Sequence, residues 1–114
     1  MKINLNRREG KCPRMLSMKL INRGTEGELK LIGRLDTTTA PDAEKLVLET
    51  AQRFESLIFN MENLDYISSA GLRVLKRAYT VMRRKDGELK IKNVNKMVME
   101  VFEITGFVGI FQFI

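Results

Sequence analysis

The sequence predicts a single α/β domain with a mixed, mainly parallel β-sheet and helices packed on it. Segments with the two-residue apolar repeat of strands alternate along the chain with segments that have the helical repeat of three and four residues. Helices that join successive strands imply right-handed crossovers and parallel strand pairs, whereas a short turn joins the first two strands and implies an antiparallel hairpin. The expected order is β-β-α-β-α-β-α-β, and 114 residues lie within the size range of one domain.

The opening hairpin is predicted from residues 15–21 and 28–35. Residues 22–27 join the two strands and include two glycines, which can supply the positive φ angles that a tight turn needs. Leu29 and Leu31 recur at a spacing of two and are expected on the buried face of the sheet.

The first helix is predicted to begin near Thr39 and to run to about Phe54. Thr39 and Asp42 have the spacing of a capping box, and Pro41 suits the first turn of a helix. Residues 56–61 follow as a short strand that is apolar on both faces, which is typical of a strand in the middle of a parallel sheet.

The second helix is predicted to begin near Ser69 and to end at Asp86 and Gly87. Leucine, tyrosine and methionine residues recur along it at spacings of three and four, which indicates one buried face. Residues 88–94 are then expected to form a strand. The outer face of this helix carries only basic charges: Arg73, Lys76, Arg77, Arg83, Arg84 and Lys85.

The third helix is predicted over residues 96–105. Asn95 is a suitable N-cap, and Gly106 stands where a left-handed residue often ends a helix. The very apolar segment 107–114 is expected to form the last strand.

The composition argues against an enzyme. The chain has no histidine, which removes the usual Ser-His-Asp and Cys-His arrangements as well as most zinc sites. A single cysteine, Cys12, cannot form an internal disulfide and favours a reducing cytoplasm. No apolar run is long enough for a membrane span, and no apolar stretch follows the basic N-terminus as in a secretory signal. We therefore expect no catalytic residue, no metal ion and no cofactor.

The net charge of +6 is concentrated at the N-terminus. Residues 1–23 carry seven basic side chains and one acidic side chain, whereas the rest of the chain is neutral overall. We interpret residues 1–14 as a basic arm and residues 15–114 as the folded domain. Such an arm can bind nucleic acid or anionic lipid, and the simpler interpretation is a solvated tail.

Chemistry is expected in the segment 65–72, which includes Ser68, Ser69 and Gly71 and leads into the second helix. One serine can serve as the N-cap of that helix. The other can accept a phosphoryl group, because free N–H groups and the helix dipole favour an anion at this position, and Arg73 adds a cation one turn later. Gly71 has two interpretations, namely a tight packing contact or room for the close approach of another backbone or a nucleotide.

Three segments resemble the bacterial anti-sigma factor antagonists, which are stand-alone STAS domains. Gly33-Arg34-Leu35-Asp36, followed by Thr37-Thr38-Thr39-Ala40, resembles the loop before the first helix of that family. Residues 60–72 resemble its strand and phosphorylation turn, and Glu103-Ile104-Thr105-Gly106-Phe107 resembles the segment before its last strand. The resemblance covers about residues 15–114 and implies a STAS-like fold.

The resemblance also implies a mechanism of partner switching. The unphosphorylated antagonist binds an anti-sigma factor that is also a serine kinase, and a sigma factor is freed. Phosphorylation by that kinase breaks the complex, and a serine phosphatase restores it. Alignment on Gly71 and Leu72 places Ser69 at the acceptor position, with Ser68 as the less favoured acceptor at a position that is often acidic in the family. The implied partner-binding residues are Asp36, Thr37, Thr38, Ser68, Ser69, Ala70, Gly71, Arg73 and Arg77.

Two other functions fit the residues. The first is a STAS-type docking module that is not phosphorylated. The second is a protein that binds nucleic acid or an anionic surface through the basic arm and the basic helix, although no aromatic side chains for base stacking are interleaved with these charges. Nucleic acid is therefore the less favoured partner, no membrane is expected, and a hydrolase with Ser69 as nucleophile would lack a histidine base.

Overall fold

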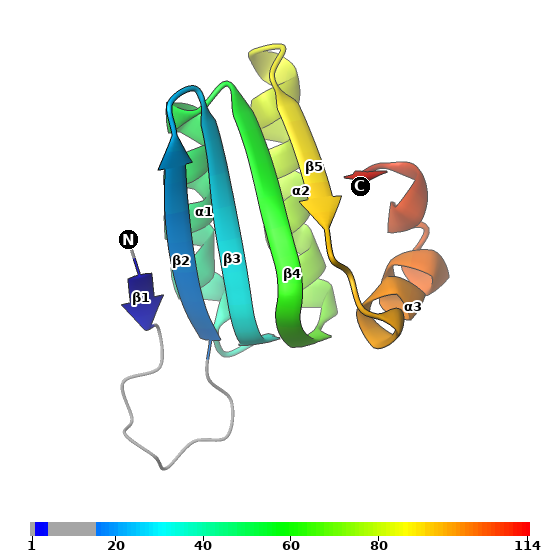
Figure 1. The fold of residues 1–114 in the computed structure, drawn as a ribbon. Helices are drawn as coiled ribbons and strands as arrows, with labels where there is room; N and C mark the ends of the chain where they lie inside the picture. Colours follow the sequence, from blue (N-terminus) through cyan, green and yellow to red (C-terminus); the bar gives the residue numbers. More distant parts are fainter. Residues whose placement is uncertain (1, 5–15) are drawn as a thin grey trace.

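Strands in the order of the chain form one mixed β-sheet in the computed structural model, which describes residues 2–4 and 16–114 (Figure 1). Helices follow the third, fourth and fifth of these strands. The strands are β1 (Lys2–Asn4), β2 (Leu16–Arg23), β3 (Glu26–Leu35), β4 (Ser56–Ile67), β5 (Glu88–Lys92) and β6 (Gln112–Phe113). The helices are α1 (Ala40–Arg53), α2 (Ser69–Arg84), α3 (Lys96–Thr105) and the 3-10 helix η1 (Phe107–Gly109).

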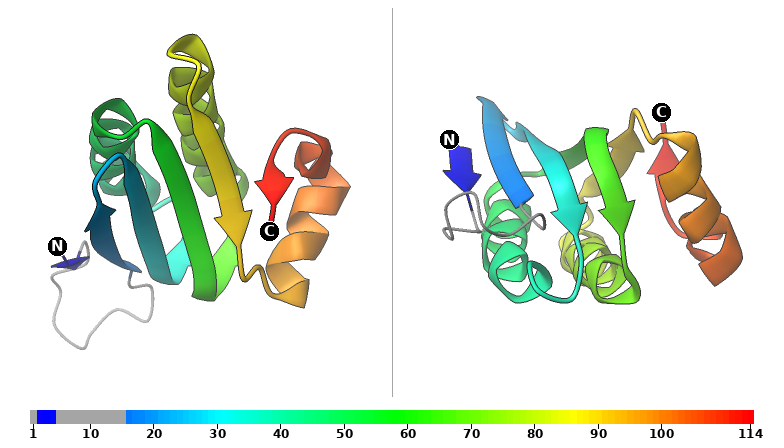
Figure 2. Two further views of the ribbon diagram at one scale, coloured as in Figure 1. Left: turned by 45° about the horizontal axis from the view of Figure 1, so that its top comes forward. Right: turned by 90° about the horizontal axis from the view of Figure 1, so that it is seen from below.

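The strand pairing confirms the predicted fold class. β1, β2 and β3 pair antiparallel, and β3, β4, β5 and β6 pair in parallel. Both α1 and α2 lie on the same face of the sheet, while α3 lies beyond the end of β5 (Figures 1 and 2). Because β5 pairs only with residues 56–60 of β4, the later half of β4 is free to contact α3, and the Asn95 Nδ2 donates to the Leu64 carbonyl at 2.7 Å.

The core lies between the sheet and the pair of helices α1 and α2. Phe59 of β4 is fully buried at the centre of the sheet, and the predicted inward residues Leu29 and Leu31 of β3 are buried as well. Val47 of α1 and Leu75 of α2 pack into the same apolar cluster. Each such side chain contributes about 1.5–3 kcal/mol by leaving water, so this layer is the main source of stability.

β4 is longer than the segment 56–61 that the sequence predicts, since it continues to Ile67. The pairing with β3 has irregularities between Lys30 and Ile32 and between Gly33 and Arg34. These shifts interrupt the alternation of side chains between the two faces of the sheet. Consecutive polar residues can therefore belong to this part of β4. The first part of the segment 65–72, in which chemistry is expected, is therefore strand.

The prediction of one strand over residues 107–114 is wrong in part, because only Gln112–Phe113 pairs in the sheet. Phe107 begins η1 instead, and Phe111 packs edge-on against Phe102 with ring centroids 5.8 Å apart. The aromatic rings thus gather around α3 rather than alternate across a strand. The C-cap prediction for the preceding helix is confirmed, since Gly106 adopts the left-handed conformation with φ of 81°.

The N-terminal region adds a strand that the sequence pattern does not predict. Lys2–Asn4 forms β1 and pairs with residues 17–19 of β2. The remainder of the predicted basic arm, together with Cys12, lies outside the described residues. Within residues 2–4 and 16–114, no helix has the length and apolar character that crossing a membrane would require.

Candidate functional site

The candidate site lies where β3 and β4 end and α1 and α2 begin. Parallel neighbouring strands end at the same edge of a sheet, which is where α/β proteins usually place their ligand-handling groups. Leu35 at the end of β3 is in register with Ile67 at the end of β4. The Ser68 N–H then donates to the Leu35 carbonyl at 2.9 Å, so the first turn of α2 is tied to the end of β3.

The two adjacent serines have different structural roles. Ser68 is the N-cap of α2, and its Oγ accepts a hydrogen bond from the Gly71 N–H at 3.3 Å. Ser69 is the first residue of the helix and its side chain is exposed. Among the described residues, Ser69 Oγ has no hydrogen-bond partner. One serine therefore stabilises the helix start, and the other presents a hydroxyl to solvent beside free helical N–H groups.

Gly71 is buried against the end of β3. A Cβ at this position would lie 2.8 Å from both the Leu35 carbonyl oxygen and the Leu35 Cγ, and 2.9 Å from Ile67 Cγ1. No side chain fits there without displacing backbone. The structure therefore supports the packing interpretation of Gly71, and this residue offers no exposed side of its own to a ligand.

Asp36 organises the loop before α1. Its Oδ1 accepts hydrogen bonds from the Thr38 hydroxyl at 2.6 Å and from the Thr38 N–H at 2.9 Å. In return the Asp36 N–H donates to Thr39 Oγ1 at 2.9 Å. The capping box that the sequence predicts between Thr39 and Asp42 is therefore wrong, because the Thr39 hydroxyl is engaged with the residues that precede it and makes no cap bond within α1.

Asp36 is buried, so its role in the loop is that of a positioning residue. Its Oδ2 lies 3.6 Å from Arg34 Nε in an ion pair, and the Arg34 guanidinium stacks over the Tyr66 ring at 4.3 Å. Arg34 and Tyr66 are in register on β3 and β4. These contacts connect the end of β3, the end of β4 and the loop before α1.

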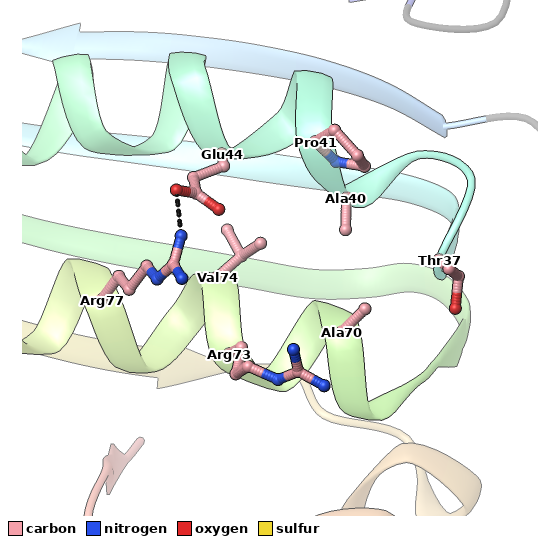
Figure 3. A pocket seen from close by; sticks show the side chains of 8 residues that line it. All are labelled: Thr37, Ala40, Pro41, Glu44, Ala70, Arg73, Val74 and Arg77. Atoms are coloured by element: carbon pink, nitrogen blue, oxygen red, sulfur yellow. Dashed lines mark hydrogen bonds and ion pairs between the residues drawn. The ribbon is translucent and has the colours of Figure 1, made fainter.

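A shallow groove of about 260 Å³ opens between the N-terminal halves of α1 and α2 (Figure 3). It is mainly apolar at its base and has arginines on the α2 side. Arg77 forms an ion pair with Glu44 across the groove, whereas Arg73 has no ion-pair partner among the described residues. The residues that line the groove are Thr37, Ala40, Pro41, Glu44, Ala70, Arg73, Val74 and Arg77.

The structure brings part of the predicted partner-binding set together in this groove. Thr37, Ala70, Arg73 and Arg77 line it, and Ser69 immediately precedes Ala70 in the first turn of α2. Thr38 is exposed in the neighbouring loop, Ser68 is half-buried as a cap, and Asp36 and Gly71 are buried beneath the surface. The predicted set therefore divides into residues that a partner can touch and residues that hold those in place.

Four groove residues are not among those predicted from the sequence: Ala40, Pro41, Glu44 and Val74. The signal that could have found them is the parallel pairing of β3 with β4, which places the first turns of the following helices side by side.

The site contains no cluster of metal ligands: among residues 2–4 and 16–114, no three His, Cys, Asp or Glu side chains are grouped as a metal ion would require.

Comparison with known sequences gives concordant matches. Residues 19–114 match the sequence profile of the STAS domain family. The chain is 40% identical over 74 residues to BtrV of Bordetella bronchiseptica, which carries the provisional name of an anti-sigma factor antagonist, and this match spans 61% of the chain and 64% of BtrV. It is 34% identical over 80 residues to the anti-sigma-B factor antagonist of Staphylococcus aureus, with 69% of this chain and 74% of that protein covered. The chain thus spans slightly less than two thirds of BtrV.

Solved structures share the fold. A crystal structure of an anti-sigma factor antagonist from Mycobacterium paratuberculosis has a TM-score of 0.81, with 90% of this chain and 87% of that chain covered at 17% identity. SpoIIAA, an anti-sigma factor antagonist solved in its unphosphorylated form, has a TM-score of 0.74, with 85% and 87% covered at 17% identity. Phosphorylated SpoIIAA of Bacillus has a TM-score of 0.67, with 85% and 90% covered at 16% identity.

Proposed function

The chain belongs to the STAS domain family and to the anti-sigma factor antagonists within it, and from this premise we propose that it binds an anti-sigma factor and thereby releases a sigma factor. This family consists of regulatory binding proteins rather than enzymes. We further propose that the anti-sigma factor is a serine kinase that phosphorylates Ser69, that a serine phosphatase reverses the modification, and that both reactions take place in the cytoplasm.

The proposal is supported mainly by the different structural roles of Ser68 and Ser69. Ser68 already caps α2, so modification of Ser69 removes no hydrogen bond from the helix. The Ser69 hydroxyl is exposed, and a kinase can therefore reach it without unfolding the chain. A phosphate at the first helical position is also favoured by the free N–H groups and by the helix dipole.

The charge of a phosphate at Ser69 would act on the groove surface rather than on the fold. Phosphorylation adds about −1.5 to −2 charges at pH 7. Arg73 lies one helical turn after Ser69 and lines the groove without an ion-pair partner among the described residues, so it is available to the phosphate. An acidic partner surface that contacts Arg73 in the unphosphorylated form would lose this cation and meet a negative charge in its place.

The proposed docking surface consists of the exposed groove residues and the first turn of α2. Arg77 remains 57% exposed in its side chain although it pairs with Glu44, so it can contact a partner as well. Ala70 offers apolar contact at the base of the groove, whereas Val74 is only 2% exposed. A partner that combines acidic and apolar side chains fits this surface, and we expect the anti-sigma factor to present such a segment.

The test is a kinase assay with purified protein, ATP and the serine-kinase anti-sigma factor from the same organism. Wild-type protein and the Ser68→Ala variant should gain one phosphate by intact mass, and the Ser69→Ala variant should gain none. The phosphorylated protein should keep the circular dichroism spectrum of the unmodified form and should lose binding to the anti-sigma factor in a pull-down experiment.

Two results would count against parts of the proposal. If Ser69→Ala is phosphorylated as well as wild type, the acceptor assignment is wrong. If no phosphate is gained although the anti-sigma factor binds, the chain is a docking module without a phosphoryl switch. The neutral Ser68 at the position that is often acidic in the family is the observation that favours this second function.

A further inference from the structure

The face of the sheet opposite α1 and α2 forms a second surface, which we name the open face. Side chains alternate along β2, so Met18 and Leu20 are buried under the helices while Lys19 and Ile21 point to the other side. No helix of the described residues lies over this side of β2, β3 and the first half of β4 (Figures 1 and 2). Contacts to the open face would therefore not involve the groove.

Strand register aligns lysines across the open face. Lys19 of β2 lies opposite Lys30 of β3, Lys30 lies beside Asn60 of β4, and Asn60 lies beside Lys92 of β5. We name Lys19, Lys30 and Lys92 the lysine row. The backbone register of β1 continues the row, because Lys2 lies opposite Lys19. Neighbouring strands are about 4.8 Å apart, so adjacent members of this row are within reach of one another.

The acid Glu28 of this face neutralises one member of the lysine row, Lys92. Glu28 is only 1% exposed, and it forms ion pairs with Arg23 and with Lys92, whose Nζ lies 3.4 Å from Glu28 Oε1. Burial alone would raise the pKa of Glu28, but hydrogen bonds from Arg23, Asn60 and Lys92 lower its pKa to about 2. The charge of Glu28 is thus already engaged. Lys19 and Lys30 form no ion pair with any described residue.

Lysines placed directly opposite each other destabilise a sheet, because their charges repel. Lys19 and Lys30 are such a pair, and apolar residues stand in the rows on either side of them. Ile21 is opposite Glu28 in one adjacent row, and Ile32 is opposite Ser17 in the other. Both isoleucines are partly exposed on the open face. Free cations flanked by accessible apolar side chains are complementary to an anionic ligand that also carries apolar groups.

We propose that the open face binds an acidic segment of a partner protein, with the segment's carboxylates on Lys19 and Lys30 and its apolar side chains on Ile21 and Ile32. The segment lies across the strands in the direction of the lysine row. This surface is on the opposite side of the sheet from the groove, so the two can be occupied together. The docking of an acidic segment would relieve the repulsion between Lys19 and Lys30.

The chemistry of the open face favours a protein segment over a nucleic acid. Single-stranded nucleic acids bind sheet faces mainly through bases stacked on exposed aromatic rings. Tyr66 is the aromatic residue that β4 places in register with Arg34, and the Arg34 guanidinium already covers its ring at 4.3 Å. Lysines without free aromatic rings but with partly exposed isoleucines better suit a chain that presents acidic and apolar side chains on the same side.

The experiment uses the full chain and a fluorescein-labelled peptide in which glutamate and valine alternate at every second position, with serine between them, so that both face the same side of an extended chain. Fluorescence anisotropy should show binding at low salt, and raising NaCl from about 50 to about 500 mM should weaken it strongly because exposed charges are screened. Lys19→Glu combined with Lys30→Glu should weaken binding by about tenfold or more, since two attractions become repulsions. Amide chemical shifts in β2 and β3 should change on titration.

Matched variants separate this surface from the general positive charge of the chain. Lys45→Glu combined with Lys96→Glu makes the same change of net charge at two exposed lysines of α1 and α3, and its affinity should stay within about twofold of wild type. Lys19→Gln combined with Lys30→Gln removes the repulsion without introducing acids. This variant should remain folded and should bind the peptide weakly.

Three results would overturn the proposal. The first is no peptide binding at low salt, and the second is an equal loss of affinity in the open-face and control double variants. The third is tighter binding of oligo(dT), or of vesicles that contain phosphatidylserine, than of the peptide. None of these measurements involves Ser69 or the groove, so their outcome is independent of the function proposed above.

Discussion

The starts of α2 and α3 are built on the same plan and differ in what they leave exposed. Each follows a parallel strand and has a polar N-cap whose side-chain oxygen accepts a hydrogen bond from the residue three positions later. Ser68 accepts from Gly71 at 3.3 Å, and Asn95 accepts from Val98 at 2.8 Å. Asn95 also donates to the Leu64 carbonyl of β4, so its side chain is wholly engaged in structure.

The difference lies in the first and third helical positions. α3 begins with Lys96 and has the buried Val98 at the third position, whereas α2 begins with Ser69 and has Gly71 there. Gly71 allows α2 to approach the end of β3 closely, and Ser69 is left as an exposed hydroxyl on that fixed turn. A common capping arrangement thus serves packing alone in α3 and supports a surface hydroxyl in α2.

The largest expected effect comes from giving α2 the residue that α3 has at its third helical position. Gly71→Val should destabilise the fold by about 3 kcal/mol, because its Cβ would lie 2.8 Å from the Leu35 carbonyl oxygen and overpacking is costly. Urea denaturation monitored by circular dichroism measures the free energy of unfolding. Gly109→Val is the matched control, since a Cβ at Gly109 meets no atom within 4 Å. Equal stability of the Gly71 variant and wild type would show that α2 can move away from β3.

Removal of the α3 cap should have the next largest effect. Asn95→Ala loses the cap bond to the Val98 N–H and the bond to the Leu64 carbonyl, and should lower the free energy of unfolding by about 2 kcal/mol. The same denaturation experiment measures it. Asn95→Asp is the informative control because it retains an acceptor for Val98 but cannot donate to Leu64. A loss of less than half a kcal/mol in Asn95→Ala would mean that the cap is not needed.

Removal of the α2 cap should cost less. Ser68→Ala loses one bond of 3.3 Å, so we expect a destabilisation of about 1 kcal/mol. Ser68→Asp restores an acceptor and places a negative charge near the helix N-terminus, and it should recover most of the loss. Thermal melts of the three proteins provide the measurement. If Ser68→Ala unfolds at the wild-type temperature, the capping role assigned to Ser68 is wrong.

The smallest expected effect on stability comes from Ser69→Ala. Its hydroxyl is exposed and forms no hydrogen bond with the described residues, so the change in the free energy of unfolding should stay within about 0.5 kcal/mol. Measuring anti-sigma factor binding together with stability for both serine variants separates the roles of the two serines. Under the proposed function, Ser68→Ala affects mainly stability and Ser69→Ala affects mainly phosphorylation. A large destabilisation by Ser69→Ala would mean that both serines are structural.

The sequence by itself determined the features that depend on local chemistry. The order of elements from β2 to α3, the N-cap at Asn95 and the left-handed C-cap at Gly106 all follow from side chains that act on neighbouring backbone. The start of α2 near Ser69 could be predicted for the same reason. Local signals failed where a competing contact was formed. The hydroxyl of Thr39 contacts Asp36 and Arg34 rather than α1, and the aromatic rings of residues 107–113 pack around Phe102 instead of forming one strand.

Only the tertiary structure decided which residues meet. The sequence allows two roles for Gly71, a packing contact or the close approach of a ligand. Its position against Leu35 shows that it is a packing contact. The groove between α1 and α2 exists because β3 and β4 are parallel neighbours, and the lysine row exists because of the register of β2, β3, β4 and β5. The pairing of β3 with β4 and of β4 with β5 joins residues far apart in the chain, which no local propensity specifies.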